Sequence, residues 1–185
     1  MAATESAMLA LGTTAPEFSL KDVRTGNIHN NDAVAGAKGL LVMFICAHCP
    51  FVKHVEKGLA KLGRDYQKSG IGIAAISSND ADNYPDDAPP GLARQAKNVG
   101  FVFPYLYDET QEVARAYDAT CTPDFFLFDG QRKLVYRGQL DSSRPGNGTP
   151  VTGSDLRAAM DALVAGRPIA KEQRPSIGCN IKWKG

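Results

Sequence analysis

Two apolar runs of strand length frame the first half of the chain. Residues 39–45 (GLLVMFI) and 71–76 (IGIAAI) are continuous enough to predict strands buried on both faces of a sheet. Between them, after Pro50, apolar residues recur at helical spacing, at positions 51, 52, 55, 59, 62 and 66, and we expect this helix to end with a cap at Gly70. Strand, helix and strand in this order indicate an α/β fold.

The flanking segments extend this alternation. The turn-like residues 24–27 follow a short apolar segment at 16–20 and predict an N-terminal β-hairpin extension. Beyond the polar loop that follows residue 76, we expect a helix at 92–99, a strand at 103–107, a helix at 108–117 that begins with a capping box, a hairpin of 125–128 and 133–139, and a helix at 154–164. We therefore predict one domain over residues 1–185, with a central mixed sheet flanked by helices and a C-terminal tail at 167–185.

The composition excludes several classes of protein. A chain of 185 residues with 43% hydrophobic residues can bury one good core, and 21 Lys and Arg against 20 Asp and Glu give no basic surface for nucleic acid or a membrane. No apolar run approaches the ~20 residues of a membrane span. The first residues, MAATESAMLALG, carry an acid where a secretory signal carries a base, so we expect a cytoplasmic protein.

A pair of cysteines joins the first apolar run to the helix. Cys46 and Cys49 have CxxC spacing, and Pro50 follows directly. Proline fits best as the first helical residue, so Cys49 becomes the N-cap. The free N–H groups of the first turn, with Lys53 and His54 nearby, would lower its pKa. We therefore predict that Cys49 is the nucleophile and that Cys46 resolves the intermediate.

A second motif precedes the late strand. Thr122 and Pro123 stand in CTPDFFLFD, and a CxxC before the first long helix together with this Thr-Pro resembles the thioredoxin-fold pattern. The segments APEFSLKDVRTG, CAHCPFVKHV, SSNDADNYPDD, FPYLYDETQEVARAY, RPGNGTPVTG and SIGCNIKWK resemble peroxiredoxin-like, thioredoxin-domain proteins of the redoxin superfamily, which includes alkyl hydroperoxide reductase and thiol-specific antioxidant. The resemblance spans nearly the whole chain.

The resemblance implies a thioredoxin fold in which the Thr122–Pro123 bond is cis and lies beside the CxxC motif. In that fold the loop offers backbone groups for substrate pairing and keeps metals away from the thiols; the alternative is an ordinary trans proline at the start of a strand. Thioredoxins attack with the first cysteine of the motif. Our assignment, which follows from Pro50, is the reverse.

The chain also departs from its relatives. Peroxiredoxins carry Thr or Ser three residues before the reactive cysteine and Arg near the late strand to bind the peroxide, and Cys46 and Pro123 stand at these positions. Thioredoxins carry a buried acid in the first buried strand, and residues 39–45 contain none. His48 could act as the base or tune the thiols, or it could simply be solvated.

Two further cysteines leave alternatives open. The position of Cys121 beside Thr122 makes it either a third redox-active thiol or a small buried residue. In the tail, Cys179 could be a second resolving cysteine, in the manner of some peroxiredoxins, or could simply pack there. A static disulfide framework is not expected in a reducing compartment.

These features predict a thiol–disulfide oxidoreductase or thiol-dependent antioxidant. The Cys49 thiolate would attack a disulfide or a hydroperoxide, and Cys46 would resolve the product. No bound cofactor is expected; the partners would be an external thiol reductant and a disulfide or peroxide substrate, and the protein a monomer or homodimer. The alternative is a zinc- or copper-binding protein or chaperone that uses Cys46 and Cys49 with His48, or with Cys121 and Cys179.

Overall fold

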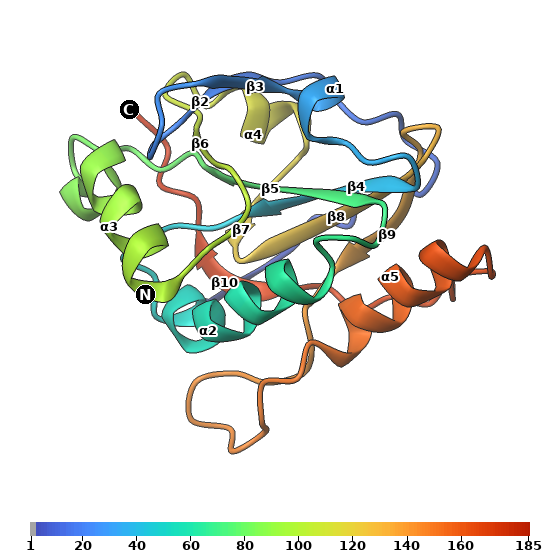
Figure 1. Cartoon of the computed structure of the whole chain (residues 1–185). Helices are drawn as coiled ribbons and strands as arrows, with labels where there is room; N and C mark the ends of the chain where they lie inside the picture. Colours follow the sequence, from blue (N-terminus) through green and yellow to red (C-terminus); the bar gives the residue numbers. More distant parts are fainter. Residues whose placement is uncertain (1–2) are drawn as a thin grey trace.

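The computed structural model describes residues 3–185, which form two β-sheets with helices on both sides of the larger one (Figure 1). The strands of the larger sheet are, in spatial order, β3 (Ile28–Asn30), β2 (Ser19–Asp22), β6 (Tyr105–Tyr107), β5 (Ile71–Ser77), β4 (Gly39–Phe44), β8 (Asp124–Asp129) and β9 (Leu134–Gly138). β5 is parallel to β4 and β6, and the other pairs are antiparallel. The sheet is therefore mixed, as predicted.

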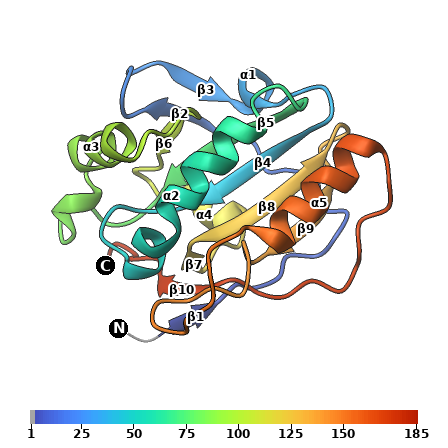
Figure 2. The same ribbon diagram turned by 60° about the horizontal axis from the view of Figure 1, so that its bottom comes forward.

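The helices lie in two layers (Figures 1 and 2). One layer contains α2 (Pro50–Asp65), α3 (Pro89–Val99) and α5 (Ser154–Ala165), and the other contains the short helices α1 (Asn31–Val34) and α4 (Glu112–Ala116). Side chains alternate along β4, because successive residues of a strand point to opposite faces. Leu41 and Met43 pack in the α2 core, and Leu40 and Val42 pack in the core beneath α4. This explains why the whole of β4 is apolar.

Two helix boundaries differ from our expectations. α2 ends at Asp65, with Tyr66 as its C-cap, rather than at Gly70. Gly70, with φ +93, instead shapes the turn into β5, and its carbonyl accepts from the Lys38 N–H. α4 begins at Glu112 rather than at 108, because the Asp108 carboxylate reaches forward to the N–H groups of residues 113 and 114.

Other boundaries shift by a few residues. α3 begins at Pro89, three residues earlier than expected, and β6 begins at Tyr105, two residues later. The hairpin of β8 and β9 forms as predicted. The N-terminal hairpin of β2 and β3 also forms, but β2 pairs with β6, so this hairpin is part of the central sheet.

The segment that we expected to be a tail contains a strand. β10 (Ile177–Asn180) lies between β1 (Ala3–Glu5) and β7 (Cys121–Thr122) in a small antiparallel sheet. Figure 2 shows this sheet beside the N-terminal end of α2. The two ends of the described chain therefore meet next to the CxxC motif.

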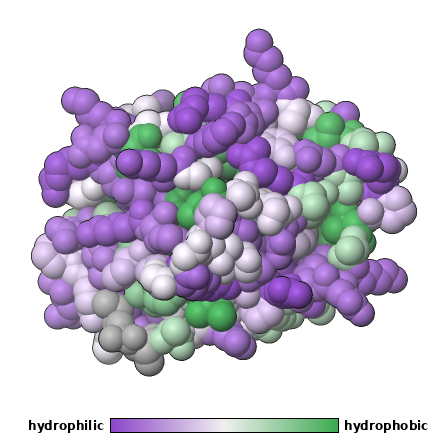
Figure 3. Space-filling view, turned by 90° about the horizontal axis from the view of Figure 1, so that it is seen from below, coloured by the Kyte–Doolittle hydropathy of each residue, from purple (hydrophilic) through white to green (hydrophobic). Residues whose placement is uncertain are grey.

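Seen from below, the molecule shows no extended apolar surface (Figure 3). Figure 3 shows the side below α2 and α5 as largely hydrophilic, with small, separate apolar areas. Within residues 3–185, every helix is too short or too polar to cross a lipid bilayer.

Candidate active site

The CxxC motif occupies the junction between β4 and α2. Pro50 is the first residue of α2, and Cys49 is the N-cap with an extended backbone, φ −70 and ψ 125. This is the geometry that the position of Pro50 predicted, since proline lacks the N–H that a first-turn residue leaves free. Cys46 and Cys49 are both fully buried, and all four cysteines are free thiols.

The Thr122–Pro123 segment lies against both sulfurs. The peptide bond between these residues is cis. The Cys49 thiol lies 3.5 Å from the Thr122 carbonyl oxygen, and the Cys46 sulfur lies 3.5 Å from the Thr122 hydroxyl oxygen. Residues separated by more than 70 positions in the chain thus meet at one point.

The two sulfurs of the motif differ in their affinity for a proton. A hydrogen bond from the Cys46 thiol, with further ones from the Cys179 thiol and from the N–H groups of Val52 and Cys179, outweighs burial and lowers the pKa of Cys49 to about 5. Burial, the hydrogen bond to Cys49 and the charge of Asp87 raise the pKa of Cys46 well above the usual value. The pair therefore holds its thiolate on Cys49 and its proton on Cys46.

A buried carboxylate supports the motif from the loop after β5. Asp87 ends a short 3₁₀ helix, η1 (Pro85–Asp87), and its Oδ1 accepts hydrogen bonds from the N–H groups of Ala47 (2.7 Å) and His48 (3.1 Å). Its Oδ2 contacts His48 Nδ1 and accepts from the Asn79 side chain (2.9 Å). Burial alone would raise the pKa of Asp87, but the hydrogen bonds from His48 and Asn79 hold it below the usual value.

His48 is held in place rather than solvated. Its ring stacks on Tyr84 with 5.0 Å between the ring centroids, and its Nδ1 is bound to Asp87. Its Nε2 is buried and has no hydrogen-bond partner among residues 3–185. The histidine therefore has one ring nitrogen bound to Asp87 and one that is buried without a partner in the described part of the chain.

A glutamine fixes the loop that contains Cys46. The Gln95 side-chain amide donates to the Cys46 carbonyl (3.0 Å) and to a Glu56 carboxylate oxygen (3.1 Å). The Tyr105 hydroxyl donates to the Gln95 Oε1 (2.9 Å). α3 and β6 thus hold the loop through Gln95.

The remaining two cysteines occupy different environments. Cys179 belongs to the same buried cluster as Cys46 and Cys49, and its position in β10 is directly opposite Thr122. The Cys121 thiol instead donates to the Pro123 carbonyl oxygen (3.7 Å), and burial raises its pKa. The structure therefore brings Cys179 to Cys46 and Cys49, whereas Cys121 bonds to its own loop.

One group in the described chain has the spacing of a metal site. Ligand atoms of Cys46, His48 and Asp87 lie within 4.8 Å of one another. Our metal-binding alternative combined Cys46 and His48 with Cys49, but Asp87 rather than Cys49 completes this group. The donor set of one sulfur, one nitrogen and one oxygen suits zinc.

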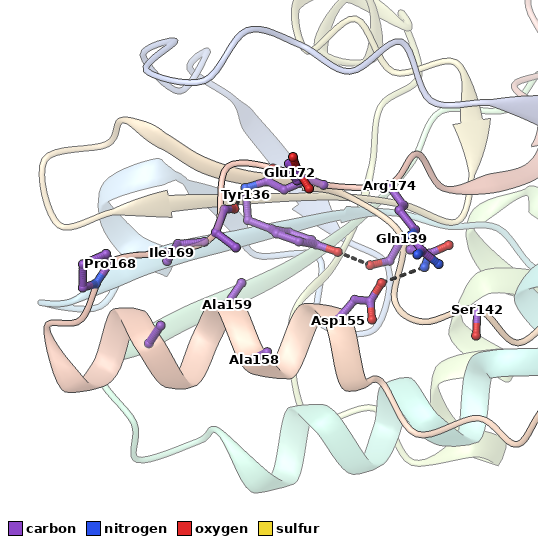
Figure 4. Close-up of a pocket in the computed structure, with 13 residues that line it drawn as sticks. Tyr136, Gln139, Ser142, Asp155, Ala158, Ala159, Pro168, Ile169, Glu172 and Arg174 are labelled. Atoms are coloured by element: carbon purple, nitrogen blue, oxygen red, sulfur yellow. Dashed lines mark hydrogen bonds between the residues drawn. The ribbon is translucent and has the colours of Figure 1, made fainter.

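A separate cavity of about 550 Å³ lies between α5, β9 and the segment 168–174 (Figure 4). Figure 4 shows Tyr136 and Asp155 pointing to Gln139, to which both are hydrogen-bonded. The described residues that line this cavity include no cysteine. It is therefore distinct from the thiol cluster.

Comparison with known proteins places these features in a family. The model of the AhpC/TSA family matches residues 11–137, a span that includes the CxxC motif and the Thr122–Pro123 segment. The chain belongs to the AhpC/TSA family. Thiol-disulfide oxidoreductase ResA of Geobacillus kaustophilus (strain HTA426) is 28% identical to this AhpC/TSA chain over 139 residues, which are 74% of the chain and 75% of the relative.

Solved structures share the fold of this chain. An uncharacterized conserved protein from Geobacillus kaustophilus matches with a TM-score of 0.98 and 56% identity, over 100% of this AhpC/TSA chain and 97% of that protein. The thioredoxin domain of a thiol-disulfide oxidoreductase from Bacteroides vulgatus matches with a TM-score of 0.61 and 18% identity, over 80% of this chain and 96% of that one. The fold is therefore thioredoxin-like, as predicted.

Sequence reasoning missed several residues of the site in this AhpC/TSA chain. Asn79 and Asp87 lie in the segment after β5 and Gln95 lies in α3, and nothing local links them to the cysteines. The one available signal was the acid-rich SSNDADNYPDD loop, because it follows a buried strand whose end lies at the same sheet edge as the CxxC motif. Our expectation for the pKa of Cys49 rested on the N–H groups of the first turn and on Lys53 and His54, and the Val52 N–H does contribute. The thiols of Cys46 and Cys179 contribute more, and His54 contacts Ser143 (2.7 Å) instead.

Proposed function

We propose that this AhpC/TSA chain is a thiol–disulfide oxidoreductase in which Cys49 is the nucleophile and Cys46 the resolving cysteine. The observation that carries the proposal is the asymmetry of the pair: Cys49 is the N-cap of α2 with a lowered pKa, and Cys46 keeps its proton. A thiolate, rather than a thiol, attacks a disulfide.

The reaction has two exchange steps. The Cys49 thiolate attacks one sulfur of a substrate disulfide, and the other sulfur leaves as a thiolate. Cys46 then loses its proton and attacks the Cys49 sulfur of the mixed disulfide, which releases the second substrate thiolate and leaves a Cys46–Cys49 disulfide. An external thiol reductant returns the pair to the dithiol state, and no bound cofactor takes part.

His48 and Asp87 supply the proton acceptor for the second step. Their ligand atoms lie within 4.8 Å of the Cys46 sulfur, and Asp87 orients the histidine through Nδ1. The buried Nε2 of His48 accepts the proton of Cys46 as that thiol attacks. This pair takes the place of the acid that residues 39–45 lack.

Hydroperoxides are a second substrate class for the same thiolate. Cys49 would attack the peroxide oxygen to give a sulfenic acid and an alcohol or water, and Cys46 would condense with the sulfenic acid and release water. Cys46 and Pro123 occupy the positions of the peroxide-binding residues, so we expect disulfide exchange to be the faster reaction. The protein would work in the cytoplasm.

The first test uses a small aromatic disulfide that releases a coloured thiol. We expect the reduced protein and Cys46→Ser to release the first thiol equivalent at similar rates, because both retain the Cys49 thiolate. Cys49→Ser should lose this phase, and Cys121→Ser is the matched control. A first phase that survives in Cys49→Ser and is lost in Cys46→Ser would reverse the assignment. Acid-quenched mass analysis after hydrogen peroxide measures the second substrate class.

Metal binding is a second candidate function, and the group of Cys46, His48 and Asp87 favours it. Protein purified without chelator would then carry zinc or copper in near-stoichiometric amount, and Asp87→Asn would lose it. Against this function, two of the three donor atoms are already bound to each other.

A further inference from the structure

A third thiol reaches the nucleophile from the C-terminal segment. β10 pairs antiparallel with β7, and Cys179 is the register partner of Thr122. Thr122 in turn contacts the sulfurs of Cys46 and Cys49. Opposite residues in antiparallel strands have Cα atoms about 4.5–5.5 Å apart. This register therefore places Cys179 beside Thr122 and close to the CxxC motif.

The close approach of β10 depends on a glycine. A Cβ atom added to Gly178 would lie 1.9 Å from the Thr122 carbonyl oxygen, so a larger residue would push the strands apart. The strand is also fastened at both ends. The Ser176 hydroxyl donates to the Pro123 carbonyl, and the Lys182 N–H donates to the Asn79 side chain (2.8 Å). These contacts hold Cys179 in a fixed position.

The environment of Cys49 has two thiol neighbours. Cys46 and Cys49 are 0% exposed and Cys179 is 2% exposed, and all three belong to one buried cluster. The thiols of both Cys46 and Cys179 lie close enough to Cys49 to lower its pKa. Each neighbour is therefore placed to attack a sulfur substituent on Cys49.

We propose that Cys179 is a second resolving cysteine, so that Cys49 can form a disulfide with either of two neighbours. The proposal rests on the proposed function, since it takes Cys49 as the nucleophile. After the first exchange, Cys179 attacks the Cys49 sulfur of the mixed disulfide, and its proton passes to the departing substrate sulfur. The substrate leaves as a thiol, and a Cys49–Cys179 disulfide forms.

The two disulfides of Cys49 can interconvert without a further oxidant. The thiolate of Cys46 attacks the Cys49 sulfur of the Cys49–Cys179 bond, and Cys179 leaves as a thiolate. The number of disulfides is unchanged. A Cys49–Cys179 disulfide can thereby be converted into the disulfide of the CxxC motif.

The decisive variant removes Cys46. Treated with the same small disulfide, Cys46→Ser should release two thiol equivalents per chain, and peptide mapping without reductant should recover a Cys49–Cys179 cross-link. The double variant Cys46→Ser/Cys179→Ser should release one equivalent and keep the mixed disulfide. We expect the second release to be about 100-fold slower in the double variant, because a held neighbour acts at a high effective concentration.

Two matched variants serve as controls. Cys46→Ser/Cys121→Ser should behave as Cys46→Ser, because the Cys121 thiol is bonded to Pro123. Cys46→Ser/Cys179→Ala repeats the test with a small apolar residue in case serine disturbs the buried cluster, and circular dichroism confirms that each variant is folded.

Each outcome decides between the proposals. A mixed disulfide that persists on Cys49 in Cys46→Ser overturns the role of Cys179 and leaves the proposed function standing. A cross-link between Cys49 and Cys121 also overturns it. If Cys46→Ser fails to release even the first equivalent, the assignment of Cys49 fails and both proposals fall together.

Discussion

The immediate neighbours of two cysteine side chains decide which of them is charged. Cys49 receives hydrogen bonds from Cys46 and Cys179, whereas Cys46 donates its own proton and lies beside the Asp87 carboxylate. Cys46 and Cys49 are only three residues apart in the sequence, yet their environments shift their pKa values in opposite directions. The chemistry therefore depends on contacts of single groups more than on the motif itself.

At this scale we predict a thiolate that survives into acid. In the reduced protein, the ultraviolet absorbance of one thiolate should titrate with a midpoint near pH 5, because the pKa of Cys49 is lowered to about 5. An ordinary cysteine titrates near pH ~8.5. Cys49→Ser should lose this step and Cys121→Ser should keep it. A midpoint near that of a free cysteine would contradict the charge assignment.

At the scale of elements, the docking of β10 on β7 leaves no room for a side chain at Gly178. We predict that Gly178→Ala lowers the free energy of unfolding by about 2 kcal/mol, because the added Cβ would meet the Thr122 carbonyl oxygen at 1.9 Å. Denaturant unfolding measures the loss. Alkylation of Cys49 in the native protein should also become faster as β10 shifts.

Gly185→Ala is the matched control for this prediction. An added Cβ at Gly185 has nothing within 4 Å, so neither stability nor alkylation should change. Equal stability of Gly178→Ala and the parent protein would show that β10 has room to accept a side chain.

The elements also show what local sequence can and cannot predict. The apolar run of β4 and the proline at the start of α2 each act over a few residues, and from them we predicted the N-cap position of Cys49 correctly. β10 was missed because its four residues, IGCN, pair with segments more than 50 and more than 170 residues away and have no apolar run of their own. Asp87 was missed for the same reason, since only the folded chain brings its loop to the motif.

For the whole molecule, the Cys49 thiolate links stability to pH. A pKa lowered to about 5 in the folded state, against about 8.5 in the unfolded chain, stabilises the fold fully above pH ~8.5, and this contribution is lost as pH falls to about 5. We predict that the free energy of unfolding of reduced protein, minus that of Cys49→Ser, rises with pH across this window. Denaturant unfolding in the presence of reductant measures it, and a flat difference would contradict the lowered pKa.

The pairing of β1 with β10 joins residues 3–5 to residues 177–179. Closing so long a loop carries a large entropic cost, and contacts between distant parts of a chain form slowly. We therefore expect the pairing of these two segments to form late in folding and to loosen early. β1 pairs with the edge of β10 that faces away from β7, so we expect a molecule in which β1 has detached to keep Cys46 and Cys49 on the β4–α2 unit but to hold Cys179 less firmly. The arrangement of the three thiols therefore depends on the whole fold, because Cys179 joins Cys46 and Cys49 only when β10 is docked.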